Sequence, residues 1–214
     1  MNQKYNALFT PWKICNVEIP NRIVQCSMGG TSLFGWMEPS HLDKEAAYFL
    51  LNRAQDGVGL ILPGMQCIKD PILGRWLYQN DKMFKDLEVY MKEFHKTGSK
   101  LFIQLAAGMG RSMAITKPMV MLLKNPLLGK IASPIADLDY ITASASATPN
   151  RWYEEIKSRP MTIQEIHDQV DAFAKTAKKL MDAGVDGVEI HAVHEGYLLD
   201  QFTISNMNYR TDEY

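Results

Sequence analysis

Two histidines and a tyrosine lie close together near the end of the sequence, as His191, His194 and Tyr197. Imidazole N–H groups can hold and polarise a carbonyl oxygen, and a phenol can release a proton as a weak acid. Two imidazoles could instead bind a metal or simply pack, but no third metal ligand stands near them. We therefore treat all three side chains as candidates for carbonyl chemistry.

Groups that could hold a flat ring occur at two earlier positions. Gln104 follows an apolar run, and its carboxamide can donate and accept at once, which matches the edge of a flavin pyrimidine. A strand-end glutamine can also be purely structural. Ser27, Met28 and Gly29 follow another apolar run and offer backbone amides and a hydroxyl. Together with the histidines, these groups suit a heteroaromatic ligand better than hydrolysis, because paired carboxylates and a serine nucleophile elbow are missing.

A repeated pattern of helix, glycine and apolar run would position these side chains. The glycines are Gly57, Gly98 and Gly184. Glycine readily takes the left-handed conformation that ends a helix, and short apolar runs are typical of strands buried on both faces. The pattern predicts parallel βα units. An open doubly wound sheet is the alternative, but residues 28–31 lack the spacing of a glycine-rich phosphate turn.

The pattern predicts four strands, near residues 22–27, 58–62, 100–105 and 187–191, and three helices, near residues 40–55, 82–97 and 162–183. In the last helix, Thr162 and Glu165 are spaced as a capping box, and an apolar stripe runs from Ile166 through Val170 to Met181. A complete (β/α)8 barrel takes ~250 residues and eight units. The predicted fold class is therefore α/β, with residues 1–214 forming the first half of a TIM barrel, about four βα units.

Two segments fall outside this pattern. Residues 8–20 are expected to form a small hairpin that covers the bottom of the first strand. Residues 106–160 show no sustained periodicity and are expected to form a long irregular loop, which in a compact domain is often functional. Its methionine-rich part, residues 113–123, would either pack on the barrel or a partner subunit or cover a bulky apolar substrate.

Composition restricts the class of protein. The chain has 214 residues, 46% hydrophobic and 22% charged, with a net charge of −1, as in an ordinary globular protein. A basic excess is missing, so nucleic acid is not an expected partner. Apolar runs fall far short of the ~20 residues that cross a bilayer, and the polar N-terminus does not resemble a secretory signal. Cys15, Cys26 and Cys67 form no CxxC pair, which favours a reducing compartment and a cytoplasmic location.

Five short stretches of the chain resemble one family. Residues 8–11 (LFTP) precede residues 21–24 (NRIV), and residues 186–191 (DGVEIH) precede residues 196–202 (GYLLDQF). The tail, residues 208–214 (NYRTDEY), completes the pattern. In combination these motifs resemble the old yellow enzyme family of NADH:flavin oxidoreductases, and a serine at position 27 resembles its enoate reductase and 2,4-dienoyl-CoA reductase branch.

The resemblance implies a TIM barrel with FMN bound at its mouth. It implies that FMN is contacted by Ser27, Met28, Gly29, Gln104 and His191. It further implies that His191 and His194 hold a substrate carbonyl oxygen and that Tyr197 donates a proton. NAD(P)H would reduce FMN, which would then pass hydride to the C=C bond of an apolar enone, 2-enoate, enoyl-CoA or steroid-like enone. A homo-oligomer is expected.

The sequence departs from the family pattern at three places. Residues 26–28 read CSM where many members have APM, and Gln104 is followed by LAAGMGR without the usual aromatic residue and histidine. Glu195 is an additional residue between His194 and Gly196. The enoate reductase group often adds a 4Fe-4S cluster and an FAD region, but residues 1–214 carry neither site. Two alternatives stay open, a truncated barrel that is not a catalyst by itself and a barrel enzyme without flavin.

Overall fold

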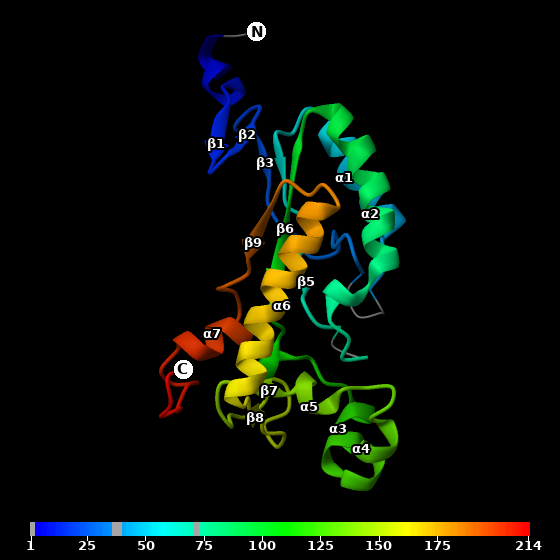
Figure 1. The fold of residues 1–214 in the computed structure, drawn as a ribbon. Coiled ribbons are helices and arrows are strands. Elements are labelled where there is room, and N and C mark those ends of the chain that lie inside the picture. Colours follow the sequence, from blue (N-terminus) through cyan, green and yellow to red (C-terminus); the bar gives the residue numbers. More distant parts are fainter. Residues whose placement is uncertain (1–2, 36–39, 71–72) are drawn as a thin grey trace.

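A parallel sheet forms the centre of the computed structural model, which describes residues 3–35, 40–70 and 73–214 (Figure 1). Its strands are β3 (Val24–Gln25), β4 (Leu60–Ile61), β5 (Gln66–Cys67), β6 (Lys100–Ala106) and β9 (Gly187–Ile190). β3 pairs with β4, β4 with β6, and β6 with β9, always in parallel. The four predicted strands are therefore present, as neighbours in chain order.

β5 was not predicted. It pairs with the end of β6, Gln66 opposite Leu105, whereas β4 pairs with its beginning, Leu60 opposite Lys100. β4 and β5 thus behave as one strand of the sheet that is interrupted around Gly64. Leu105 is also paired with Ile190, so β9 occupies the other edge of β6.

Three long helices pack on one face of this sheet: α1 (Lys44–Gln55), α2 (Asp81–Phe94) and α6 (Ile163–Asp182) (Figure 1). The short 3-10 helices η2 (Leu77–Gln79) and η3 (His95–Thr97) flank α2. The main core joins strand and helix side chains, among them Ile61, Leu101, Ile103, Leu50, Leu87 and Leu180. Helices on one face of parallel strands, joined in chain order, are the βα units that the sequence predicts.

A hairpin closes the N-terminal ends of the strands. It consists of β1 (Trp12–Ile14) and β2 (Val17–Ile19), which pair antiparallel after the 3-10 helix η1 (Gln3–Phe9). Ile19 is fully buried and packs with Leu60, Leu62 and Phe102 on the sheet face away from the helices. The predicted hairpin is confirmed, and its apolar contacts fill the bottom of the sheet.

The helix ends follow from capping groups. Asp43 accepts hydrogen bonds from the backbone at Glu45 and Ala46, so α1 begins at Lys44, four residues later than predicted. α6 begins with the predicted capping box of Thr162 and Glu165.

The predicted apolar stripe of α6 is partly wrong. Val170 and Met181 are 62% and 66% exposed. The buried face includes the polar residues Gln169 and Thr176, which a search for apolar periodicity passes over.

Residues 106–160 are not one irregular loop. They contain η4 (Gly110–Ser112), α3 (Lys117–Lys124), α4 (Pro126–Ala132), α5 (Leu138–Ile141) and β7 (Ala143–Ser144), followed by β8 (Arg159–Pro160), which pairs with β7. None of these helices exceeds eight residues, so helical periodicity had too little length to appear. The apolar residues Met113, Ile115, Ile141 and Ile156 give this segment a small core of its own.

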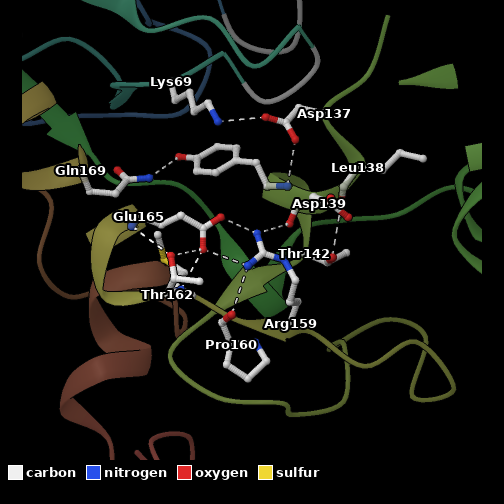
Figure 2. Close-up of polar contacts among 12 residues, drawn as sticks. Lys69, Asp137, Leu138, Asp139, Thr142, Arg159, Pro160, Thr162, Glu165 and Gln169 are labelled. Carbon is white, nitrogen blue, oxygen red and sulfur yellow. Dashed lines mark hydrogen bonds and ion pairs between the residues drawn. The ribbon is translucent and has the colours of Figure 1, made fainter. Parts of the chain in front are cut away.

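Polar contacts fasten this segment to the chain just after β5 and to the start of α6 (Figure 2). Lys69 Nζ lies 2.9 Å from Asp137 Oδ2, and Arg159 Nη2 lies 2.7 Å from Glu165 Oε1. The Arg159 guanidinium lowers the pKa of Glu165 to about 2 by hydrogen bonding and charge. The hydroxyl of Tyr140 donates to the carbonyl of Ala107, which fixes the segment directly beyond β6.

Candidate functional site

Side chains from three strands meet at the C-terminal end of the sheet. Ser27 Oγ donates to Gln104 Oε1 at 3.0 Å, and Gln104 Nε2 donates to Glu189 Oε1 at 2.5 Å. Gln104 and Glu189 are direct partners in the register of β6 and β9. The structure therefore brings Ser27 and Gln104 together, as their strand ends predict. Glu189 was missed, although it stands two residues before His191 and so on the same strand face.

His191, His194 and Tyr197 form a ring cluster just beyond β9. The centroids are 5.2 Å apart for the two imidazoles, 5.4 Å for His191 and Tyr197, and 4.8 Å for His194 and Tyr197. The backbone N–H of His191 donates to the carbonyl of Leu105 at 2.8 Å, which continues the β6–β9 ladder. The candidate residues at 191, 194 and 197 thus lie together beside Ser27 and Gln104, which form the rim at the C-terminal end of the sheet.

The protonation states of two of these rings follow from their surroundings. Burial, with a smaller contribution from the charge of His194, lowers the pKa of His191, so its imidazole is neutral near pH 7. Burial, followed by the negative charge of Glu195, raises the pKa of Tyr197, so its phenol keeps its proton. Nδ1 of His191 is buried and has no hydrogen-bond partner within the described residues.

The loop that carries these rings is organised by Asp200, in α7 (Leu198–Thr203). Asp200 is 3% exposed, and its Oδ2 accepts the backbone N–H groups of His194 at 2.9 Å, Gly196 at 2.8 Å and Tyr197 at 3.1 Å. A carboxylate that accepts several backbone N–H groups fixes their conformation strongly. Asp200 therefore positions the loop through the backbone of His194, Gly196 and Tyr197.

Gln201, fully buried, joins this loop to the segment after β6. Its Nε2 donates to the carbonyls of Gly196 at 2.6 Å and Met109 at 2.9 Å, and its Oε1 accepts from Ser144 Oγ at 2.5 Å. Gly110 has φ +53°, and a Cβ there would lie 2.3 Å from Gln201 Oε1, so only glycine fits. Neither role was predicted from the sequence, where Gln201 was noted only as part of the GYLLDQF motif.

The loop after β3 forms an open part of the rim. Met28 is 48% exposed, and a Cβ on Gly29 would meet no atom within 4 Å. Gly64 approaches this loop closely, because a Cβ on it would lie 2.5 Å from the carbonyl oxygen of Met28. The backbone N–H of Gly64 donates to Thr31 Oγ1 at 2.9 Å, which fixes the loop.

These features fit the ring of a bound FMN. The open surface at Met28 and Gly29 leaves space for a flat ring. Beside its bonds to Ser27 and Glu189, the Gln104 carboxamide keeps one N–H and one lone pair for such a ring. The unpartnered Nδ1 of His191 adds one more polar contact.

A cavity of about 260 Å³ opens beside Tyr197. Its wall is lined by Met109, Ser112, Met113, Ala114, Arg151, Trp152, Glu195 and Tyr197. The wall combines apolar side chains and an indole with a single ion pair, Arg151 and Glu195, at 2.5 Å. This cavity was not predicted, because most of its lining comes from residues 106–160, which showed no periodicity.

Among residues 3–35, 40–70 and 73–214, no helix combines the length and apolarity that a membrane crossing needs.

Comparisons with known proteins identify the family of this chain. The family model described as "NADH:flavin oxidoreductase / NADH oxidase family" matches residues 7–214. A cinnamate reductase of Clostridium sporogenes is 36% identical over 221 residues, covering 100% of this chain and 30% of that protein. An NADPH dehydrogenase of Bacillus velezensis is 33% identical over 218 residues, covering 97% of this chain and 54% of that protein.

A solved structure shares the fold over nearly the whole chain. The Old Yellow Enzyme from Pichia sp. AKU4542 superposes with a TM-score of 0.72 at 25% identity, covering 97% of this chain and 51% of that one. The chain thus spans between 30% and 54% of the length of the two curated relatives.

Proposed function

Because the chain belongs to the NADH:flavin oxidoreductase / NADH oxidase family, we propose that it is the FMN-holding first half of a TIM-barrel ene-reductase. The proposed reaction is reduction of the C=C bond of an α,β-unsaturated carbonyl compound with NAD(P)H. The observation that supports it most is the cluster of His191, His194 and Tyr197 at the rim where Ser27 meets Gln104.

The residues of the rim would hold FMN. Backbone groups at Met28 and Gly29, the hydroxyl of Ser27 and the carboxamide of Gln104 would contact its ring, with His191 beside them. When bound, FMN supplies hydride, taken from NAD(P)H, to the β-carbon of the alkene.

The ring cluster would bind the carbonyl end of the substrate and supply a proton to it. N–H groups of His191 and His194 donate to the carbonyl oxygen and stabilise the negative charge that develops there during hydride addition. The lowered pKa of His191 keeps this imidazole neutral, so it acts as a hydrogen-bond donor and holds its proton. Tyr197 gives its phenolic proton to the α-carbon and regains one from water.

The cavity beside Tyr197 favours a substrate with an apolar substituent. Its volume of about 260 Å³ and its methionine and tryptophan lining suit an aryl or alkyl group on the alkene. The similarity to a protein named cinnamate reductase makes an aryl 2-enoate the first substrate to test. An enone, an enoyl-CoA and a steroid-like enone are the other members of the proposed class.

The proposal is tested with the full-length protein. Anaerobic NAD(P)H should bleach the flavin absorbance near about 450 nm, and cinnamate or 2-cyclohexenone should restore it. Tyr197→Phe should slow product formation by roughly 10²–10⁴-fold. Tyr48→Phe, at a tyrosine that is 69% exposed on α1, is the control and should leave the rate of product formation unchanged. Full-length protein that holds no flavin, or reduced flavin that neither substrate reoxidises, would exclude the proposed activity.

A second candidate concerns the 214-residue chain by itself, which we propose is not a catalyst. Within the described residues, β9 pairs only with β6. Ile190 on β9 is 49% exposed and lines an apolar hollow of about 360 Å³ with Val170, Phe173 and Phe202. An open strand edge beside apolar surface favours self-association. Light scattering and FMN titration test this, and a monomer that binds FMN tightly would refute it.

A further inference from the structure

An ion pair stands at the rim of the cavity beside Tyr197. Arg151 Nη1 lies 2.5 Å from Glu195 Oε2 and also donates to the backbone carbonyl of Glu195 at 3.3 Å. Both side chains line the same cavity as Tyr197. Since Glu195 is two residues before Tyr197, the ion pair connects the loop that carries Tyr197 to the segment between β7 and β8.

Contacts other than the ion pair fix the backbone and the guanidinium of Arg151. Its backbone N–H donates to the carbonyl of Arg111 at 3.0 Å, and its guanidinium lies over the ring of Trp152, 5.1 Å from the centroid. Trp152 in turn donates from Nε1 to the carbonyl of Ser112 at 3.2 Å. A guanidinium that is fixed in this way loses little conformational entropy when it binds a carboxylate.

We propose that Arg151 is a positioning residue for the proton donor, because it neutralises Glu195 and holds the loop of residues 194–197 so that Tyr197 remains an effective acid. This inference rests on the proposed ene-reductase function. The partner of Arg151 is the residue that is additional to the family pattern, and the guanidinium compensates the charge that this residue brings to the site.

The charges around Tyr197 give the direction of the effect. Burial, Glu195 and the thiol of Cys67 raise the pKa of Tyr197, whereas Arg151 lowers it. The imidazoles of His191 and His194 contact the same ring. Without Arg151, the uncompensated carboxylate would make the phenolate less favourable and Tyr197 a weaker acid. Because the ion pair is partly exposed, solvent and salt screen this effect.

The chemistry of the substrate separates proton donation from hydride transfer. With an enone, hydride adds to the β-carbon and the electron pair moves to the carbonyl oxygen. The O–H bond of Tyr197 then breaks as a C–H bond forms at the α-carbon, and water returns a proton to the phenolate. With a nitroalkene, hydride addition gives a nitronate, which is stable enough to leave without an enzymatic acid. Only the first reaction needs Tyr197.

The experiment uses the full-length enzyme and compares both substrates. Arg151→Met should slow enone turnover about tenfold and increase its solvent deuterium isotope effect, since a weaker acid makes protonation limiting. Nitroalkene reduction should change less than twofold. Arg151→Lys should restore part of the enone rate. Arg151→Met combined with Glu195→Gln should be faster than Arg151→Met alone, because the unpaired carboxylate is gone.

Arg53→Met is the matched control. Arg53 also forms an exposed ion pair, with Asp56 at 3.5 Å, and also lies over an aromatic ring, that of Phe49 at 4.7 Å, but on α1. It should leave both rates unchanged. If Arg151→Met slows both substrates equally, or neither, the inference is wrong. If the wild-type enzyme reduces neither substrate, the proposed function itself fails.

Discussion

Asp200→Asn tests how the loop of the ring cluster is held. The substitution keeps the shape of the side chain but removes the negative charge that accepts N–H groups from His194, Gly196 and Tyr197. Hydrogen bonds to a charged group contribute about 1.5–3 kcal/mol, and neutral ones about 0.5–1.5 kcal/mol. Three weakened bonds therefore predict a loss of about 2–3 kcal/mol, somewhat less than a simple sum because they share one acceptor.

The assay is urea unfolding of the full-length holoprotein, followed by circular dichroism and by flavin fluorescence. Asp182→Asn is the control, because Asp182 is exposed on α6 and its ion pair with Lys178, at 2.5 Å, joins two side chains that are both more than half exposed. An exposed pair of this kind contributes about 0.5 kcal/mol or less. If Asp200→Asn destabilises the protein no more than Asp182→Asn, the three hydrogen bonds do not hold the loop as described.

Further predictions concern packing, pH and reactivity. Gly187→Ala places a Cβ 2.6 Å from the ring of Phe102 and should cost about 1–3 kcal/mol in urea unfolding. Arg159 lowers the pKa of Glu165 to about 2, below the value in the unfolded chain. The contribution of the Glu165 carboxylate to stability is therefore present above about pH 4.5 and is lost as the pH falls towards 2. Glu165→Gln should therefore flatten the acid side of a pH–stability curve, and an unchanged curve would contradict this. Burial raises the pKa of Cys67 to about 12, so mass spectrometry should find it alkylated at pH 8 far more slowly than the chain's two exposed cysteines.

The sequence predicts the regular part of the fold well, because its signals are local and strong. The helix α6 has a capping box and 20 residues over which periodicity can appear. β6 is an apolar run that directly follows a helix-ending glycine, Gly98, with φ +82°. By contrast, β5 has two residues and follows an interruption, so nothing in its local pattern distinguishes it from a loop.

The short helices after β6 have weaker signals in the sequence, which lie at their first residues. Pro118 is the second residue of α3 and Pro126 the first residue of α4, within the first turn where proline is tolerated, and Asn125 caps α4 through its side chain. Each helix is stabilised by tertiary contacts that periodicity over eight residues cannot reveal.

The site was predictable where strand ends decide it and unpredictable where distant segments meet. Ser27 follows β3 and Gln104 lies near the end of β6, and both strands pair with β4 in the same parallel sheet, so the topology places the two residues at the same end. The cavity wall at Arg151 depends on contacts between residues about 40 positions apart, such as its ion pair with Glu195. Gln201 contacts residues 92 positions away, and no local pattern encodes such a contact.

The hairpin of β1 and β2 has a practical consequence for handling the protein. It seals the amino ends of the strands (Figure 1). Gln104 and Tyr197 lie at their carboxyl ends, one length of β6 or about 20 Å away. A dye or surface linker attached to η1 would therefore stand at the opposite end of the sheet from the rim. Attachment there should leave the rim turned towards solution, which suits a sensor that reads the proposed reaction.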